Sequence, residues 1–252
     1  MTAAVGLLNV MLGIAYCCYG VMTAVELRRD WQLQGPSRFA VAWIFMAFTC
    51  GPHHLFHGHH LLFEGRSGGA LDLTAVIVGL PLGVAFLALR VEAFIGGRGD
   101  RFVAGTPWWM KAMPTLAAVY ATALIAAVLR VGPLTDLPPT AYPNVLLFGI
   151  YMAIGYFLLR TQLRNRVPMG GWSVSGSSLT GVFPTCAIMH GVFILYGATG
   201  LYAYDVHSFT IDWLGVPAGL YFLFVVRGLY RASIRDWNRD MVDMTPQPAA
   251  VG

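Results

Sequence analysis

Seven apolar runs, each of about 20 residues or more, take up most of this chain and constrain its fold more than any other feature. About 20 mainly apolar residues are needed to cross the hydrocarbon core of a bilayer as an α-helix. Because a backbone inside lipid must satisfy its hydrogen bonds within the segment, each run predicts a helix. Glycine and proline fall in the gaps, as at Gly35-Pro36 and Pro138-Pro139. The predicted spans are residues 3–26, 39–62, 71–95, 109–130, 144–163, 177–204 and 209–230.

The composition agrees with a membrane environment. Hydrophobic residues make up 57% of the chain and charged residues 11%, and the mean hydropathy is +0.63. A soluble domain carries roughly 25% charged residues. The net charge of +4 is spread over short loops rather than gathered in a stripe, which argues against a nucleic-acid partner. We therefore predict an all-α integral membrane protein with the lipid bilayer as its partner. A homo-oligomer or a larger membrane complex stays open.

The basic residues predict how the bundle is oriented. With seven spans, all 16 lysines and arginines except Arg66 and Arg130 fall on one side of the membrane. Cytoplasmic loops carry an excess of lysine and arginine, so that side is predicted to be cytoplasmic. We expect the N-terminus outside the cell (plasma) membrane and the C-terminus inside. The expected organisation is a seven-helix transmembrane domain over residues 1–230 and a cytoplasmic polar tail over residues 231–252.

Five of the seven histidines lie in one eight-residue segment, His53-His54-Leu55-Phe56-His57-Gly58-His59-His60, here named the histidine segment. It falls in the predicted outer half of the second span. Ionisable side chains are costly in hydrocarbon, so they usually face a bundle interior or a cavity and indicate a functional site. Gly51-Pro52 comes just before the segment, and proline removes a helix hydrogen bond. We therefore expect a kink or break at Pro52, followed by residues that border a polar cavity.

The helical period separates these histidines into two faces. At about 100° per residue, His53, His57 and His60 form one stripe, with His54 on its shoulder and His59 on the opposite face. Neighbours at i, i+4 face each other, and two imidazoles at that spacing can hold one metal ion. His57, in the middle of the stripe, is the expected centre of such a site.

The sixth span carries a second group at a similar predicted depth. His190 is expected near the depth of His53, and each has a cysteine about one turn deeper, Cys186 and Cys50. If the two spans touch, the four side chains form a Cys₂His₂ cluster. Nearer the predicted outer surface lie further candidates for ligands, supporting partners or an entry funnel: Glu64, Asp72, Asp205, His207 and Asp212.

This pattern favours metal binding, serving metal transport or membrane redox chemistry, and leaves open whether the protein is an enzyme. Imidazole suits zinc, copper and iron, and thiolate shifts the preference toward copper(I) or zinc. Haem b, clamped between His57 and His190, is the main variant. Two other classes remain: a proton relay or pH sensor without metal, and a structural subunit of a larger complex. The candidate metal ligands are His53, His54, His57, His60, His190, Cys50, Cys186, Asp72 and Asp212.

The outline resembles that of microbial rhodopsins, which have seven spans and an outside N-terminus. Those proteins bind retinal through a lysine in the last span. The span over 209–230 contains Asp212 but no lysine, and Val216 stands one turn after the aspartate. No Schiff base can form without that lysine, so the resemblance implies the architecture alone. The order HxxHxHH in the histidine segment also departs from the HxxHH boxes of fatty-acid elongases and desaturases.

Overall fold

The computed structural model describes residues 1–66, 68–106, 108–133, 136–201 and 206–243, with side chains except at 33–34, 109, 206–208 and 233–243. In this part of the chain, seven helices are long and apolar enough to cross a membrane. The prediction of an all-α, seven-helix membrane bundle is confirmed at that level. The helices are α1 (Thr2–Gln34), α2 (Arg38–Phe63), α3 (Ala70–Phe94), α4 (Trp108–Val131), α5 (Tyr142–Asn165), α6 (Val174–Thr199) and α7 (Val206–Asp243).

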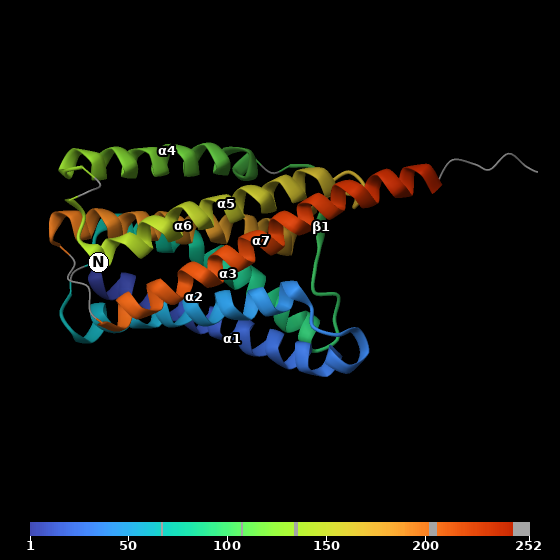
Figure 1. Cartoon of the computed structure of the whole chain (residues 1–252), viewed down its shortest axis with the longest axis horizontal. Coiled ribbons are helices and arrows are strands. Elements are labelled where there is room, and N and C mark those ends of the chain that lie inside the picture. Colours follow the sequence, from blue (N-terminus) through green and yellow to red (C-terminus); the bar gives the residue numbers. More distant parts are fainter. Residues whose placement is uncertain (67, 107, 134–135, 202–205, 244–252) are drawn as a thin grey trace, which may run out of the picture.

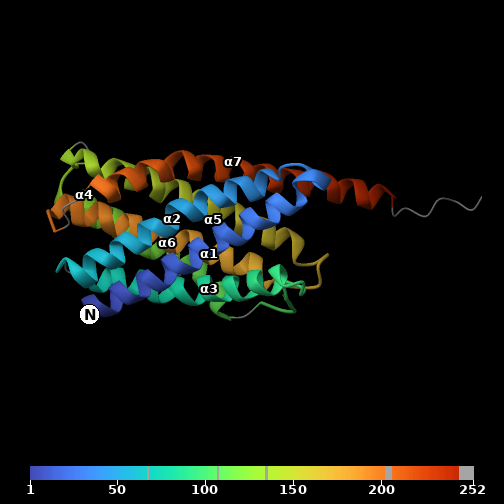
Figure 2. The same ribbon diagram turned by 90° about the horizontal axis from the view of Figure 1, so that it is seen from below.

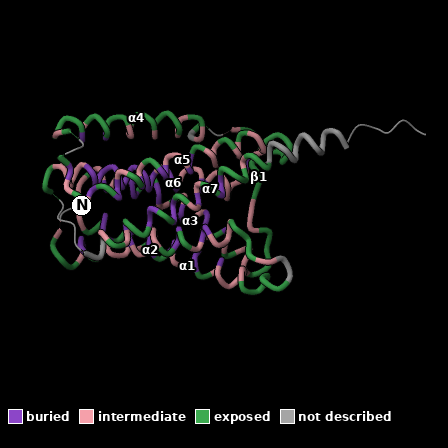
Figure 3. Tube along the Cα trace, viewed as in Figure 1, coloured by how far each residue is buried: buried purple, intermediate pink, exposed green. Residues whose placement is uncertain are grey.

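The helices lie side by side and alternate in direction along the chain (Figures 1 and 2). The contacts between them arrange six of the seven in a ring. Helix α1 packs against α2 and α3, α2 packs against α7, and α7 packs against α5. Both α5 and α3 pack against α6, which closes the ring. Helix α4 lies outside it against α6. In the most apolar 18-residue stretch of each helix, 78% of the residues of α6 are buried but only 11% of those of α4. Figure 3 shows α4 as a mostly exposed tube. The core of the bundle is therefore centred on α6.

The alternating helices sort the chain connections into two ends (Figure 1). The N-terminus and the C-terminal ends of α2, α4 and α6 lie at one end, together with Arg66 and Arg130. The connections after α1, α3 and α5 lie at the other end, with the basic residues that the sequence assigns to the cytoplasm. The segregation of charge expected from the sequence is therefore present in the fold. Which end faces the cytoplasm stays a prediction from the positive-inside rule.

A short antiparallel strand pair ties two connections together at the predicted cytoplasmic end. Strand β1 (Phe102–Val103) pairs with β2 (Trp172–Ser173). Beside it, Asp100 accepts hydrogen bonds from Ser173 Oγ at 2.6 Å and from the backbone N–H of Ser175 at 3.0 Å. Burial alone would raise the pKa of Asp100, but these hydrogen bonds and one from the Arg101 backbone hold it below its usual range. The charged carboxylate thus fixes the start of α6.

Several helix bounds differ from those expected. Helix α6 ends at Thr199, while the helical residues of α1 and α7 run on to Gln34 and Asp243. The first part of the predicted polar tail therefore continues α7, and residues 244–252 lie outside the described part. Of the kink or break expected at Pro52, the break does not occur, because α2 is helical without interruption across this residue. Proline removes one hydrogen bond, and packing on α1 supports the helix on both sides of it.

Glycines bring α1 and α2 into backbone contact beside the histidine segment. A Cβ atom on Gly51 would lie 2.6 Å from Cys17 Sγ, and one on Gly58 would lie 2.9 Å from the Gly6 carbonyl oxygen. Small residues at such interfaces let helix backbones approach closely in membranes. This contact positions the face of α2 that carries His53, His54 and His57.

We expect Gly58→Leu to destabilise the bundle by about 1–3 kcal/mol, because a side chain there must push α1 away from α2. Thermal or denaturant unfolding of the protein in detergent micelles measures the change. Gly149→Leu is the matched control, since a Cβ at Gly149 meets nothing within 4 Å. Equal free energies of unfolding for Gly58→Leu and Gly149→Leu would contradict the close packing of α1 on α2.

Candidate metal centre

The histidine segment presents its faces as the helical period predicts. His53, His54, His57 and His60 are buried. The side chain of His59, on the opposite face, is 55% exposed. The prediction of a buried histidine stripe with His59 outside it is therefore confirmed.

Side chains from four helices meet in one chain of polar contacts inside the bundle. His53 Nδ1 of α2 lies 2.8 Å from Asp212 Oδ1 of α7. Asn144 Nδ2 of α5 donates to Asp212 Oδ2 at 2.8 Å, and His190 Nδ1 of α6 lies 2.5 Å from Asn144 Oδ1. Asp212 is 2% exposed and Asn144 is not exposed at all. The order His53–Asp212–Asn144–His190 thus joins two imidazoles through a carboxylate and an amide.

This chain fixes which ring nitrogens carry protons. An amide oxygen can only accept, so His190 Nδ1 must donate to Asn144 Oδ1. An ionised carboxylate also only accepts, so the His53 Nδ1 that lies 2.8 Å from Asp212 Oδ1 is the protonated ring nitrogen. In the neutral rings, both Nε2 atoms then keep their lone pairs. Imidazoles that ligate metals are usually oriented in this way, with the other N–H donated to a carboxylate or carbonyl.

The donors of this group converge on one point. One ligand atom from each of His53, His190 and Asp212 lies within 4.8 Å of those of the other two. The rings of His53 and His190 have centroids 5.0 Å apart. Among the described residues, His53 Nε2 is buried and has no hydrogen-bond partner. An unpaired buried polar atom is costly, so this nitrogen suits a site for an ion or a water molecule.

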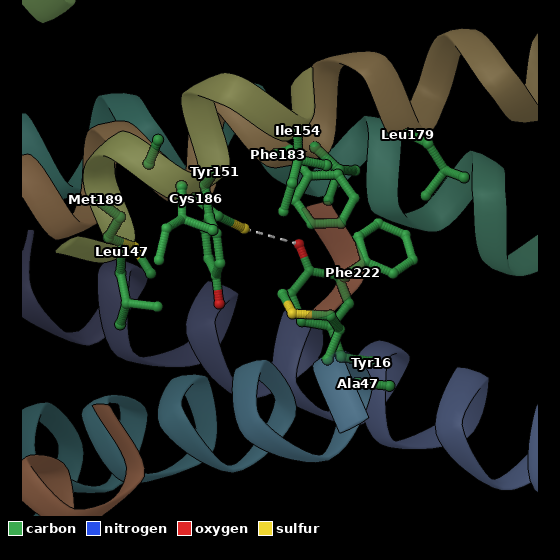
Figure 4. Close-up of a cluster of buried hydrophobic side chains, with 14 of the residues drawn as sticks. Tyr16, Ala47, Leu147, Tyr151, Ile154, Leu179, Phe183, Cys186, Met189 and Phe222 are labelled. Carbon is green, nitrogen blue, oxygen red and sulfur yellow. Dashed lines mark hydrogen bonds between the residues drawn. The ribbon is translucent and has the colours of Figure 1, made fainter. Parts of the chain in front are cut away.

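Both predicted cysteines line the small cavity beside these histidines, but each contacts a tyrosine. Cys50 Sγ lies 3.0 Å from Tyr151 Oη, and Cys186 Sγ lies 3.3 Å from Tyr16 Oη. Figure 4 shows the Tyr16–Cys186 contact among the packed side chains of the core. The three ligand groups that converge are two histidines and an aspartate, and the thiols lie beside them as polar neighbours.

The remaining predicted residues lie apart from this group. His54 Nδ1 lies 2.8 Å from Asn9 Oδ1 of α1. His57 is buried with its ring against Phe193, at a centroid distance of 4.8 Å. His60 Nδ1 lies 2.7 Å from Glu64. Asp72 caps the start of α3, accepting from the Gly69 backbone N–H at 2.9 Å. Asp205 and the side chain of His207 lie outside the described residues.

Sequence reasoning missed Asn144, which joins Asp212 to His190. The signal was present, because Asn144 is a polar residue at the start of a long apolar run. Buried polar side chains in membrane helices hydrogen-bond across helices, so such an asparagine predicts a partner. Its partners could not be named, since no rule from the sequence alone places α5 between α6 and α7.

No family model, no curated protein and no solved structure matches the chain. The site is therefore interpreted from its own residues.

Proposed function

We propose that this membrane protein binds one transition-metal ion between His53, His190 and Asp212 and uses it in metal transport or membrane redox chemistry. One observation carries the proposal: three buried ligand groups from three helices converge to within 4.8 Å. Charged groups in a membrane usually face the bundle interior and are paired or functional. The carboxylate would offset part of the charge of the ion. Under the predicted topology, the ion lies in the outer half of the cell membrane.

The size of the cavity favours a metal ion over haem. The space beside His53 and His190 has room for about one water molecule. Haem b between His57 and His190 would need a slot as wide as a porphyrin, whereas the His57 ring packs against Phe193. This contact and the small cavity support a single ion.

The chemistry of the donors favours zinc or iron(II). Two imidazoles and one carboxylate are the protein ligands of many catalytic zinc sites and of non-haem iron(II) sites, with positions left open. Each carboxylate oxygen has more than one lone pair, so Asp212 can keep its bonds to His53 and Asn144 while it ligates. The sulfur-preferring ion copper(I) is less favoured, because Cys50 and Cys186 contact tyrosine hydroxyls.

A second candidate function is proton transfer without metal. The observation that favours it is the row of polar contacts that joins His53, Asp212, Asn144 and His190 across four helices. Histidine titrates near neutral pH and can pass a proton between its two ring nitrogens. In this function the histidines exchange protons with a water molecule in the cavity that they line, and Asp212 stabilises the charged form of His53.

Metal analysis of the purified protein separates the two functions. After the affinity tag is removed and the protein is washed with a chelator, we expect about one equivalent of zinc or iron to stay with the folded chain, because the site is buried. A protein that retains no metal after the wash, and none after titration followed by a second wash, would overturn the metal function. Proton flux into liposomes, lost in Asp212→Asn, would then support the proton function.

A further inference from the structure

A second group of metal-ligating side chains lies at the predicted outer end of α2. His59 and His60 end the histidine segment, and Glu64 caps the helix, its backbone N–H donating to the His60 carbonyl at 3.3 Å. The Glu64 carboxylate reaches both rings: Oε2 lies 2.7 Å from His60 Nδ1 and Oε1 lies 3.3 Å from His59 Nδ1. One ligand atom from each of the three lies within 4.8 Å of the others.

This outer group differs from the buried centre in its exposure at the surface of the bundle. The side chains of His59 and Glu64 are 55% and 41% exposed, whereas that of His60 is 5% exposed. The hydrogen bond with His60 holds the pKa of Glu64 below its usual range, so the carboxylate is ionised at neutral pH. Two imidazoles and a carboxylate next to water offer three ligands, and water molecules can complete the coordination.

We propose that His59, His60 and Glu64 form a second, solvent-accessible site for a divalent zinc or copper ion. Nitrogen and oxygen ligands suit both ions. Arg66 Nη2 lies 3.6 Å from Glu64 Oε2 and competes for the carboxylate, so this site is weaker than the buried one. At 1.5 Å per residue, His60 stands about 10 Å along α2 from His53, and each site can therefore be removed without the other.

The test is a titration of the tag-free protein with Zn²⁺ by calorimetry, together with electron paramagnetic resonance of added Cu²⁺. We expect a second, chelator-removable ion in the wild type, with nitrogen hyperfine coupling in the copper spectrum. Glu64→Gln and His59→Ala change exposed side chains, so both variants should fold. Each variant should lower the affinity of the outer site for this ion at least tenfold. Arg66→Gln should raise the affinity of the outer site by about two- to fivefold, because the substitution removes the competing cation.

The outer site does not depend on the buried one, and the experiment keeps their failures apart. In His190→Ala the chelator-removable ion should persist while the retained ion is lost. Absence of a removable ion in the wild type would overturn the outer site, and so would binding that Glu64→Gln leaves unchanged. Loss of the retained ion alone bears only on the function proposed for the buried centre.

Discussion

His190→Ala and His53→Ala are each expected to abolish the retained metal ion. Each change removes one of only two imidazoles, so affinity should fall by more than the roughly 10–100-fold that loss of an outer-sphere partner costs. His190→Ala also removes the buried hydrogen bond from His190 to Asn144, which should destabilise the bundle by about 1–3 kcal/mol. Metal content after a chelator wash, with thermal unfolding of the same samples, measures both effects.

His59→Ala and His57→Ala are the matched controls for these two variants. His59 lies on the exposed face of α2, so the retained ion should be unaffected by its loss. His57 packs against Phe193 one turn from His53, and its replacement should leave a cavity but keep the ligands. If either control loses the retained ion as completely as His190→Ala, the site is centred elsewhere on the histidine stripe.

Asp212→Asn is expected to weaken metal binding at least 10–100-fold and to destabilise the metal-free protein. An asparagine there has one oxygen, yet His53 Nδ1 contacts one oxygen of Asp212 and Asn144 Nδ2 donates to the other. One donor would therefore face the new amide nitrogen, and an unsatisfied buried donor costs about 1–3 kcal/mol. The negative charge that offsets the ion is lost as well. Binding isotherms for Zn²⁺ and unfolding of the metal-free variant measure the two effects.

Glu26→Gln serves as the control for this loss of charge. Glu26 pairs with Arg90 near the predicted cytoplasmic end, away from the metal centre. The variant removes one carboxylate of an ion pair but should leave the retained ion in place. Wild-type affinity in Asp212→Asn would show that the carboxylate neither ligates the ion nor supports His53.

Much of the fold follows from the sequence because lipid imposes simple rules. Apolar length gave seven spans, and the arginines separated the connections into two groups that the fold keeps apart. Helical periodicity also placed His59 outside and His53 inside. The break that Pro52 allowed for does not occur, since a proline's effect depends on the neighbouring helix. Here Gly51 and Gly58 lie against α1 so closely that the helix is supported on both sides.

The site was harder to predict because it depends on which helices touch. Periodicity made His57 the centre of the stripe, but Phe193 occupies the space opposite it. His190 and Asp212 instead come together at His53, and Asn144 joins them from α5. The depths of His53 and His190 were matched correctly, whereas the contacts of Cys50 and Cys186 with tyrosines depend on rotations of helices that one sequence does not specify.

X-ray absorption spectroscopy of the zinc-loaded, chelator-washed protein tests the central claim most directly. The proposed ligands predict a first shell of nitrogen and oxygen atoms at about 2.0–2.2 Å, with multiple scattering from two imidazole rings. His190→Ala should remove this signal, and Glu64→Gln should leave it unchanged. Sulfur scattering at about 2.3 Å would contradict the account by making Cys50 and Cys186 the ligands, and a spectrum of hydrated zinc alone would contradict a buried site.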